Sequence, residues 1–175
     1  MIFTGEWSLA VKEAEATNAL ADQGCDVVTC HVDGPKVICE TAVSRDIFVC
    51  GYHADQTPIA GDKYLTGAEW NWASVYTDMV AKTLAGEPIP NFVRGGLADG
   101  FIKMSPLGPA VSDAARAQFE ATKAEIEAGG FAAIKGPLKD NKGNVIAAEG
   151  ESFVETDVAI ESMDYLVEGV IGSTS

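Results

Sequence analysis

Each of the two histidines is followed two residues later by an aspartate, giving the pairs His31–Asp33 and His53–Asp55. Each pair comes directly after a short apolar run, "DVVTC" before the first and "DIFVCGY" before the second. Such runs are typical of strands buried in a parallel sheet, and the carboxyl ends of parallel strands meet at one edge, where ligands bind. Imidazole and carboxylate groups gathered there could hydrogen-bond a polar ligand, coordinate a metal ion or activate a nucleophile.

Tryptophans accumulate near the second pair. The segment "GYHADQTPIAGDKYLTGAEWNW" holds one of the two histidines and two of the three tryptophans, Trp70 and Trp72. The third, Trp7, follows the short run "IFTG". Flat aromatic faces suit stacking on a planar organic ligand, whose amino or hydroxyl groups would donate hydrogen bonds to Asp33 and Asp55. We place Trp70 and Trp72 at the start of a helix, where residues two apart point away from each other, so only one of them should face the ligand.

Two enzyme-like alternatives use the same residues. Cys30, His31, His53 and Asp55 are acceptable zinc ligands by type, but none belongs to a CxxC, HxxxH or HExxH spacing, so we expect no metal site. A thiol nucleophile, Cys30 or Cys50 beside one of the histidines, would make the protein a small hydrolase. Cysteines embedded in strands are usually inert, so a metal- or cysteine-dependent hydrolase stays the alternative interpretation.

The sequence lacks the glycine-rich phosphate loops GxxxxGK[ST] and GxGxxG, and it lacks the GxSxG nucleophile elbow. We therefore expect no nucleotide cofactor. The 26 acidic and 12 basic residues give a formal charge of −14, which disfavours nucleic acid and anionic membranes as partners, because both need clustered Lys and Arg. No apolar stretch approaches the roughly 20 residues of a membrane span, and we expect no secretory signal within this chain.

The four cysteines all lie in the first third of the chain, at Cys25, Cys30, Cys39 and Cys50. They sit inside apolar runs, where cysteine behaves as a small buried hydrophobic residue. A disulfide framework would instead staple distant loops of a small domain. We therefore favour free, buried thiols over a disulfide framework.

The first half of the chain alternates strands and helices. The expected elements are a strand stub at 2–5, a helix at 8–24, strands at about 26–31 and 47–52, and a helix at about 35–44 between those strands. Ser8 is the expected N-cap of the first helix. This β-α-β-α-β order predicts parallel strands with helical crossovers, an α/β fold with a Rossmann-like parallel sheet flanked by helices.

The second half is more varied. The expected elements are a helix at 71–86, two short strands within 89–105, an amphipathic helix at 112–130, a hairpin at 131–148 and a last helical segment at 156–172. The residues "DNKG" provide the turn of the hairpin. We find no internal repeat and no clear linker.

Several long stretches closely resemble one family along nearly the whole chain. They are "DQGCDVVTCHVDGPKVICETAVSRDIFVCGYHADQ", "YLTGAEWNW", "AGEPIPNFVRGGLADGFIKMSP" and "KGPLKDNKGNVI". The sequence resembles the BMP family of basic membrane proteins, or PnrA-like lipoproteins. The resemblance implies a type I periplasmic-binding-protein fold and the solute-binding component of an ABC importer, with an ABC transporter permease as partner and no enzymatic activity. It also implies a periplasmic or membrane-anchored extracytoplasmic location.

The resemblance covers only the second half of such a protein. It implies that residues 1–63 form the ligand-binding α/β lobe. Residues 64–175 would then supply the hinge crossing, a helix that returns to the first lobe, and the C-terminal strands and helices. Without most of the first lobe, sheet edges and apolar faces would be exposed, so we expect self-association.

The implied ligand is a purine nucleoside or purine base, bound in a cleft between two lobes. The family's pattern carries Trp7, the loop with His53 and Asp55, and Trp70 into the ligand site. His31 and Asp33 join this site through the strand-end argument. Nucleoside-binding members have a lysine where this chain has Trp70, which favours a free base or another flat ligand.

Overall fold

The computed structural model describes residues 1–154 and 157–174. The chain divides into two compact units, one formed by Glu6–Glu127 and the other by Met1–Gly5 together with Ala128–Ser175. The larger unit contains all six residues predicted to bind ligand. The functional division into 1–63 and 64–175 stays a prediction.

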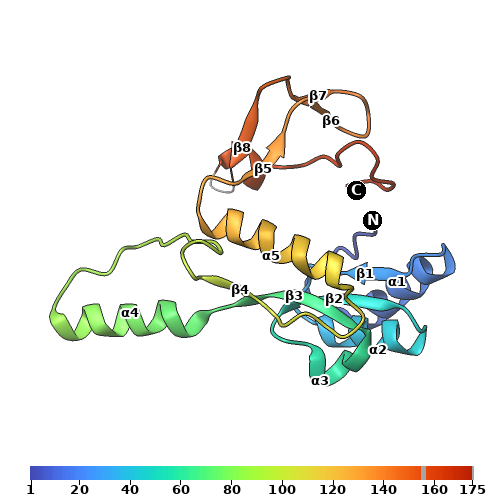
Figure 1. The fold of residues 1–175 in the computed structure, drawn as a ribbon, viewed down its shortest axis with the longest axis horizontal. Coiled ribbons are helices and arrows are strands. Elements are labelled where there is room, and N and C mark those ends of the chain that lie inside the picture. Colours follow the sequence, from blue (N-terminus) through green and yellow to red (C-terminus); the bar gives the residue numbers. More distant parts are fainter. Residues whose placement is uncertain (155–156, 175) are drawn as a thin grey trace. The chain divides into compact units, whose positions relative to one another are not determined.

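A four-stranded sheet organises the larger unit (Figure 1). Its strands are β1 (Val27–Thr29), β2 (Phe48–His53), β3 (Tyr64–Trp70) and β4 (Ile102–Met104), in the order β1-β2-β3-β4. The β1–β2 and β2–β3 pairs are parallel, and the β3–β4 pair is antiparallel. The predicted parallel pairing of the strands near 26–31 and 47–52 is therefore confirmed.

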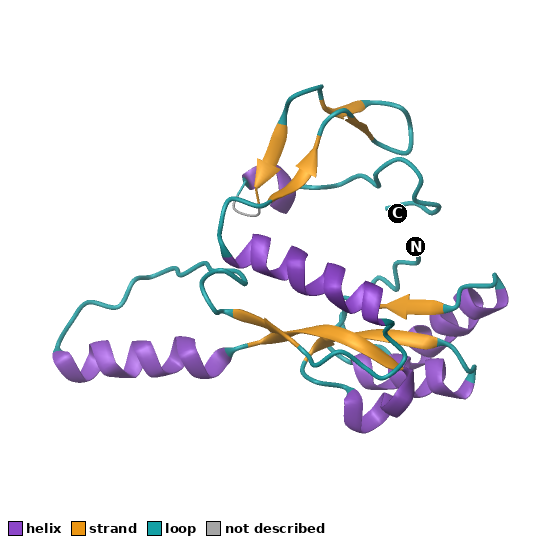
Figure 2. Ribbon diagram, in the orientation of Figure 1, coloured by secondary structure: helices purple, strands orange, loops and turns teal. Residues whose placement is uncertain are grey.

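Helices lie on both sides of this sheet, in agreement with the Rossmann-like prediction (Figure 2). The elements are α1 (Ala10–Asp22), α2 (Pro35–Ser44), α3 (Thr57–Ala60), a 3₁₀ turn (Gly61–Lys63), α4 (Trp72–Ala85) and α5 (Asp113–Glu127). Figure 2 shows α2 and α3 on one side of the sheet and α5 on the other. Ile38, Cys39 and Ala42 of α2 pack against Val28 and Val49 of the first two strands and form the core with them.

Three predictions for the larger unit and its N-terminal approach are wrong. The run at 2–5 forms no strand, and those residues belong to the other unit. Leu9, not Ser8, is the N-cap of α1, and its backbone N–H donates to Oε1 of the buried Glu13 at 2.9 Å. Residues 89–105 contain one strand instead of two, because two prolines at 88 and 90 lack the N–H groups that a ladder needs.

The smaller unit contains two antiparallel strand pairs. β5 (Ala132–Lys135) pairs with β8 (Ser152–Val154), and β6 (Leu138–Lys139) pairs with β7 (Val145–Ala147). The predicted turn after β6 is confirmed, since Asp140 Oδ1 accepts hydrogen bonds from the backbone N–H groups of Lys142 and Asn144, both at 2.8 Å.

The last helix is much shorter than predicted. It is α6 (Val158–Glu161), while Thr156 lies outside the described residues. The backbone farther on pairs with the β6–β7 hairpin: Glu168 N–H donates to Lys139 O at 2.9 Å, and Leu166 O accepts from Asn141 N–H at 2.8 Å. These bonds replace those of a continued helix. Within residues 1–154 and 157–174, each helix is too short or too polar to cross a membrane.

Tyr64 joins β2, β3 and β4. Its side chain is 1% exposed, and its ring lies over Gly51 and Gly67, which are register partners on β2 and β3. Ser105 Oγ donates to Glu69 Oε1 at 2.7 Å, so the Tyr64 hydroxyl must donate to Ser105 Oγ, 2.9 Å away. The buried hydroxyl therefore depends on Ser105 as the acceptor of its proton.

Replacing Tyr64 by Phe should remove that bond while the ring stays in place. We expect Tyr64→Phe to lower the free energy of unfolding by about 1–2 kcal/mol. Tyr76→Phe is the matched control, since Tyr76 is 60% exposed, and its cost should stay within about 0.5 kcal/mol. Urea denaturation measures both variants, and equal losses would contradict the assigned network.

Candidate functional site

The carboxyl ends of three parallel strands gather most of the predicted site. His31 and Asp33 follow β1, His53 is the last residue of β2, and Trp70 is the last residue of β3. Trp7 lies at the same edge, but it does not follow a strand as predicted. No strand precedes it, and its carbonyl instead accepts a hydrogen bond from the Asp33 backbone N–H at 2.6 Å.

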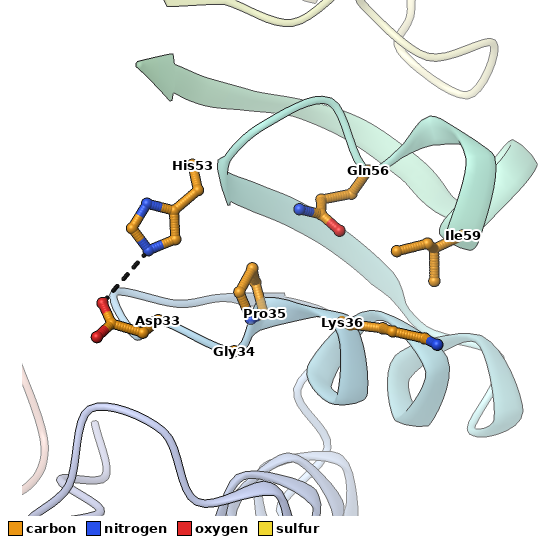
Figure 3. Close-up of a pocket in the computed structure, with 7 residues that line it drawn as sticks. All are labelled: Asp33, Gly34, Pro35, Lys36, His53, Gln56 and Ile59. Atoms are coloured by element: carbon orange, nitrogen blue, oxygen red, sulfur yellow. Dashed lines mark ion pairs between the residues drawn. The ribbon is translucent and has the colours of Figure 1, made fainter. Parts of the chain in front are cut away.

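His53 lies between an indole and a carboxylate. Its Nδ1 accepts a hydrogen bond from Trp70 Nε1 at 2.7 Å, and its Nε2 lies 3.5 Å from Asp33 Oδ1 (Figure 3). An indole N–H can only donate, so Nδ1 must carry a lone pair and the imidazole proton must sit on Nε2. The neutral ring therefore points its N–H toward Asp33.

A continuous series of aromatic rings runs along this edge. Consecutive centroids are 5.4 Å apart for Trp7–His31, 4.7 Å for His31–Tyr52, 5.8 Å for Tyr52–Trp70, 5.7 Å for Trp70–Trp72 and 5.8 Å for Trp72–Tyr76. We call these six residues the aromatic series. Neighbouring rings in the series meet edge to face or tilted, so they pack against one another along the strand ends.

Trp70 and Trp72 contact each other, contrary to the prediction that they point apart. Trp70 ends a strand and Trp72 begins α4, so the two do not share the geometry of a helix. The sequence reasoning also missed Tyr52, which lies in the middle of the aromatic series. Its position next to His53, one residue before the end of β2, was the signal that could have indicated it.

A pocket of about 530 Å³ opens beside His53 (Figure 3). Its lining is Asp33, Gly34, Pro35, Lys36, His53, Gln56 and Ile59. This volume lies within the range of small-molecule sites. Gln56, a residue absent from the sequence prediction, is buried, and its amide N–H donates to the Tyr52 carbonyl at 3.3 Å.

Asp55 follows His53 but has a local role in the structure. Its Oδ1 accepts hydrogen bonds from the backbone N–H and the hydroxyl of Thr57, at 2.9 and 2.6 Å, and so stabilises the turn into α3. The carboxylate is exposed. A contact between Asp55 and a ligand stays a prediction.

The cysteines are poorly suited to nucleophilic chemistry. All four are free thiols. Burial raises the pKa of Cys30 to about 12 and that of Cys39 to about 11, and burial also raises the pKa of Cys50. These thiols stay protonated at neutral pH, which weakens the hydrolase alternative. Across the described part of the chain, no three His, Cys, Asp or Glu residues are arranged to hold a metal ion.

The raised pKa values predict slow thiol chemistry. Native Cys30 and Cys39 should react with iodoacetamide at pH 8 about a hundredfold or more slowly than in urea, because the thiolate fraction falls tenfold per pKa unit. The folded-state pKa of Cys30 also lies above its unfolded value of 9.0. The contribution of this thiol to the free energy of unfolding is therefore fully present below pH 9 and is lost as the pH rises toward 12. Labelling followed by peptide mass spectrometry measures the reactivity, and equal native and denatured rates would contradict the burial assigned to these thiols.

Comparisons with known proteins assign the family. A profile described as ABC transporter substrate-binding protein, PnrA-like, matches residues 2–130. The chain is 31% identical over 170 residues to a purine-binding protein of Brucella abortus (strain 2308), covering 97% of this chain and 47% of that protein. It is 28% identical over 158 residues to TsgA13 of Haloferax volcanii, named as an ABC transporter glucose-binding protein, covering 90% of this chain and 37% of that one.

This chain thus spans less than half the length of either curated relative. Among solved structures, a transcriptional activator of the comK gene from Bacillus halodurans superposes with a TM-score of 0.67 at 23% identity. That match covers 73% of this chain and 45% of the other, and it shows a shared fold. The family match spans well over half of the chain, and the chain therefore belongs to the PnrA-like ABC transporter substrate-binding proteins.

Proposed function

We propose that this chain supplies ligand-binding residues to the solute-binding component of an ABC importer, and that the ligand is a purine base or nucleoside. The observation that carries the proposal is the edge where the aromatic series, His53 and Asp33 lie together beside a pocket of about 530 Å³. Trp7 or Trp70 of the series would stack on the purine, while Asp33, Asp55 and the His53 N–H would bind its polar edge. His31 would contribute a ring edge.

The two curated relatives point to different ligands. The Brucella protein is named for purines and the Haloferax protein for glucose. Stacking on aromatic rings is sequence-tolerant for nucleobases because every base has a π face, and this contact favours a purine. Trp70 stands where nucleoside-binding members of the family have a lysine, and this difference favours a free base over a nucleoside.

The proposal extends to the whole transport system. The protein would work outside the cytoplasmic membrane, anchored as a lipoprotein, and would deliver its ligand to an ABC permease. Residues 1–63 would hold most ligand contacts, and residues 64–175 would carry the chain across the hinge. The raised thiol pKa values support a binding role over the hydrolase alternative.

Calorimetry with adenine, guanosine, inosine and glucose tests the ligand class. We expect purine binding to weaken about tenfold or more in Trp70→Ala, because a stacked aromatic contributes roughly 1–3 kcal/mol per base. Asp55→Asn should weaken binding by a similar factor while its side-chain oxygen still accepts the Thr57 hydrogen bonds. Cys30→Ser is the control and should change affinity little.

The outcomes separate the alternatives. Unchanged purine affinity in both Trp70→Ala and Asp55→Asn would place the ligand elsewhere. Binding of glucose without purines would contradict the purine assignment. An activity that disappears in Cys30→Ser would favour the hydrolase.

We also propose that copies of this chain associate through α4. Trp72, Tyr76, Val80 and Leu84 follow one another at four-residue steps, and their exposed fractions are 53%, 60%, 57% and 84%. The segment 72–94 carries two acidic and two basic residues, so its net charge is zero within a chain of −14. Repulsion between copies is therefore weaker at this segment than the average over the acidic chain, which makes a second copy its favoured partner.

Light scattering measures this association. Replacing both Tyr76 and Leu84 by Ser should shift the chain toward monomer at high concentration, because apolar area would no longer be buried. Val145→Ser, at another exposed apolar side chain (66%), is the control and should leave the mass unchanged. A wild-type chain that stays monomeric throughout would contradict the proposal.

A further inference from the structure

We infer that His53 is a positioning residue for Trp70, and that protonation of His53 releases the indole from its ligand-binding orientation. In its neutral form His53 fixes the indole through Nδ1. In its charged form it can no longer accept that bond and turns to Asp33. The consequence for ligand affinity rests on the proposed function, whereas the coupling between His53 and Trp70 does not.

The hydrogen bond fixes the protonation state that it needs. Trp70 Nε1 lies 2.7 Å from His53 Nδ1, a short distance for an N–H···N contact. Because an indole nitrogen is a donor only, the bond exists only while Nδ1 is unprotonated. The imidazolium form carries a proton on both nitrogens, so two N–H groups would face each other at 2.7 Å. The side chains must then separate.

Asp33 offers the charged ring another partner. Its Oδ1 lies 3.5 Å from His53 Nε2, and both residues line the pocket (Figure 3). At this distance the carboxylate can form an ion pair with a charged imidazole ring. The His53 side chain is 30% exposed, so protons from solvent reach it. Two arrangements therefore compete: a neutral ring bound to Trp70, and a charged ring paired with Asp33.

The other carboxylates near His53 are bound to other residues, and the remaining titratable neighbours are not carboxylates. Glu69, its register partner on β3, is 3.0 Å from Lys103 of β4 and accepts from Ser105. Asp55 is bound to Thr57. The remaining neighbours are the Tyr52 phenol, whose pKa burial raises, the His31 ring against Tyr52, and Lys36 of the pocket lining. Asp33 is thus the carboxylate that faces the imidazole.

Trp70 depends on this bond for its orientation. Its ring centroid lies 5.8 Å from Tyr52 and 5.7 Å from Trp72, and such ring contacts tolerate rotation far better than a hydrogen bond does. Trp70 also lines a groove with Tyr76 and Phe101. Losing the bond to His53 frees the indole to rotate against its ring neighbours.

NMR of the free chain tests the coupling without any ligand. The ¹H–¹⁵N resonance of the Trp70 indole should move as the pH is lowered and the imidazole gains its second proton. His53→Asn should abolish this titration, because the Asn side-chain oxygen replaces Nδ1 as acceptor and does not protonate. Asn also suits the backbone at this position, where φ is +75°. His31→Asn is the matched control and should leave the titration intact.

Calorimetry with adenine then tests the consequence. Wild-type affinity should fall about tenfold from pH 8 to pH 5, whereas His53→Asn should keep its affinity across that range. An indole resonance independent of pH in the wild type, or one that still titrates in His53→Asn, overturns the inference. If adenine binds at no pH, the proposed function fails, and the indole titration alone still decides the role of His53.

Discussion

The burial of Tyr64 over two glycines is the constraint on which the site depends. A Cβ built at Gly51 would lie 2.7 Å from the Tyr64 ring, and one built at Gly67 would overlap the hydroxyl. Only this glycine pair lets the ring lie flat across β2 and β3 and reach Ser105 beside β4. The pairing of Gly51 with Gly67 sets the register that brings His53 opposite Glu69, one residue from Trp70. The His53–Trp70 bond is therefore a consequence of how the strands pack.

The backbone at His53 departs from ordinary strand geometry at this point. Its φ of +75° is uncommon outside glycine and costs conformational energy, and such residues are often found at functional positions. The turn aims the imidazole across the strand ends, between Trp70 and Asp33. Asp55, two residues later, stabilises the following turn by accepting two hydrogen bonds from Thr57.

The sequence predicted the parallel strands β1 and β2 and the helices α2, α4 and α5 because each is marked locally. Apolar β-branched runs indicate buried strands, and Gly86, with φ of +71°, ends α4 where the sequence places its stop. The convergence of His31, Asp33 and His53 followed from topology alone. The strand at β3 was not predicted, since "YLTGAEW" becomes a strand only when Tyr64 is buried against β2. The direction of the Trp70 hydrogen bond depends on that same tertiary contact, and no local pattern reveals it.

The resulting polarity of the edge bears on which ligand it suits. Because the indole N–H occupies Nδ1, neutral His53 offers a ligand only the Nε2–H donor, and Asp33 offers only acceptor oxygens beside it. A neighbouring donor and acceptor, fixed in direction and flanked by ring faces, match the edge of a nucleobase, where N–H groups and lone pairs alternate in a plane. Sugar hydroxyls each donate and accept and can rotate, so they gain less from a fixed pattern. For the proposed ligand, this match in polarity and planarity is the physical reason why a purine would bind better than a hexose.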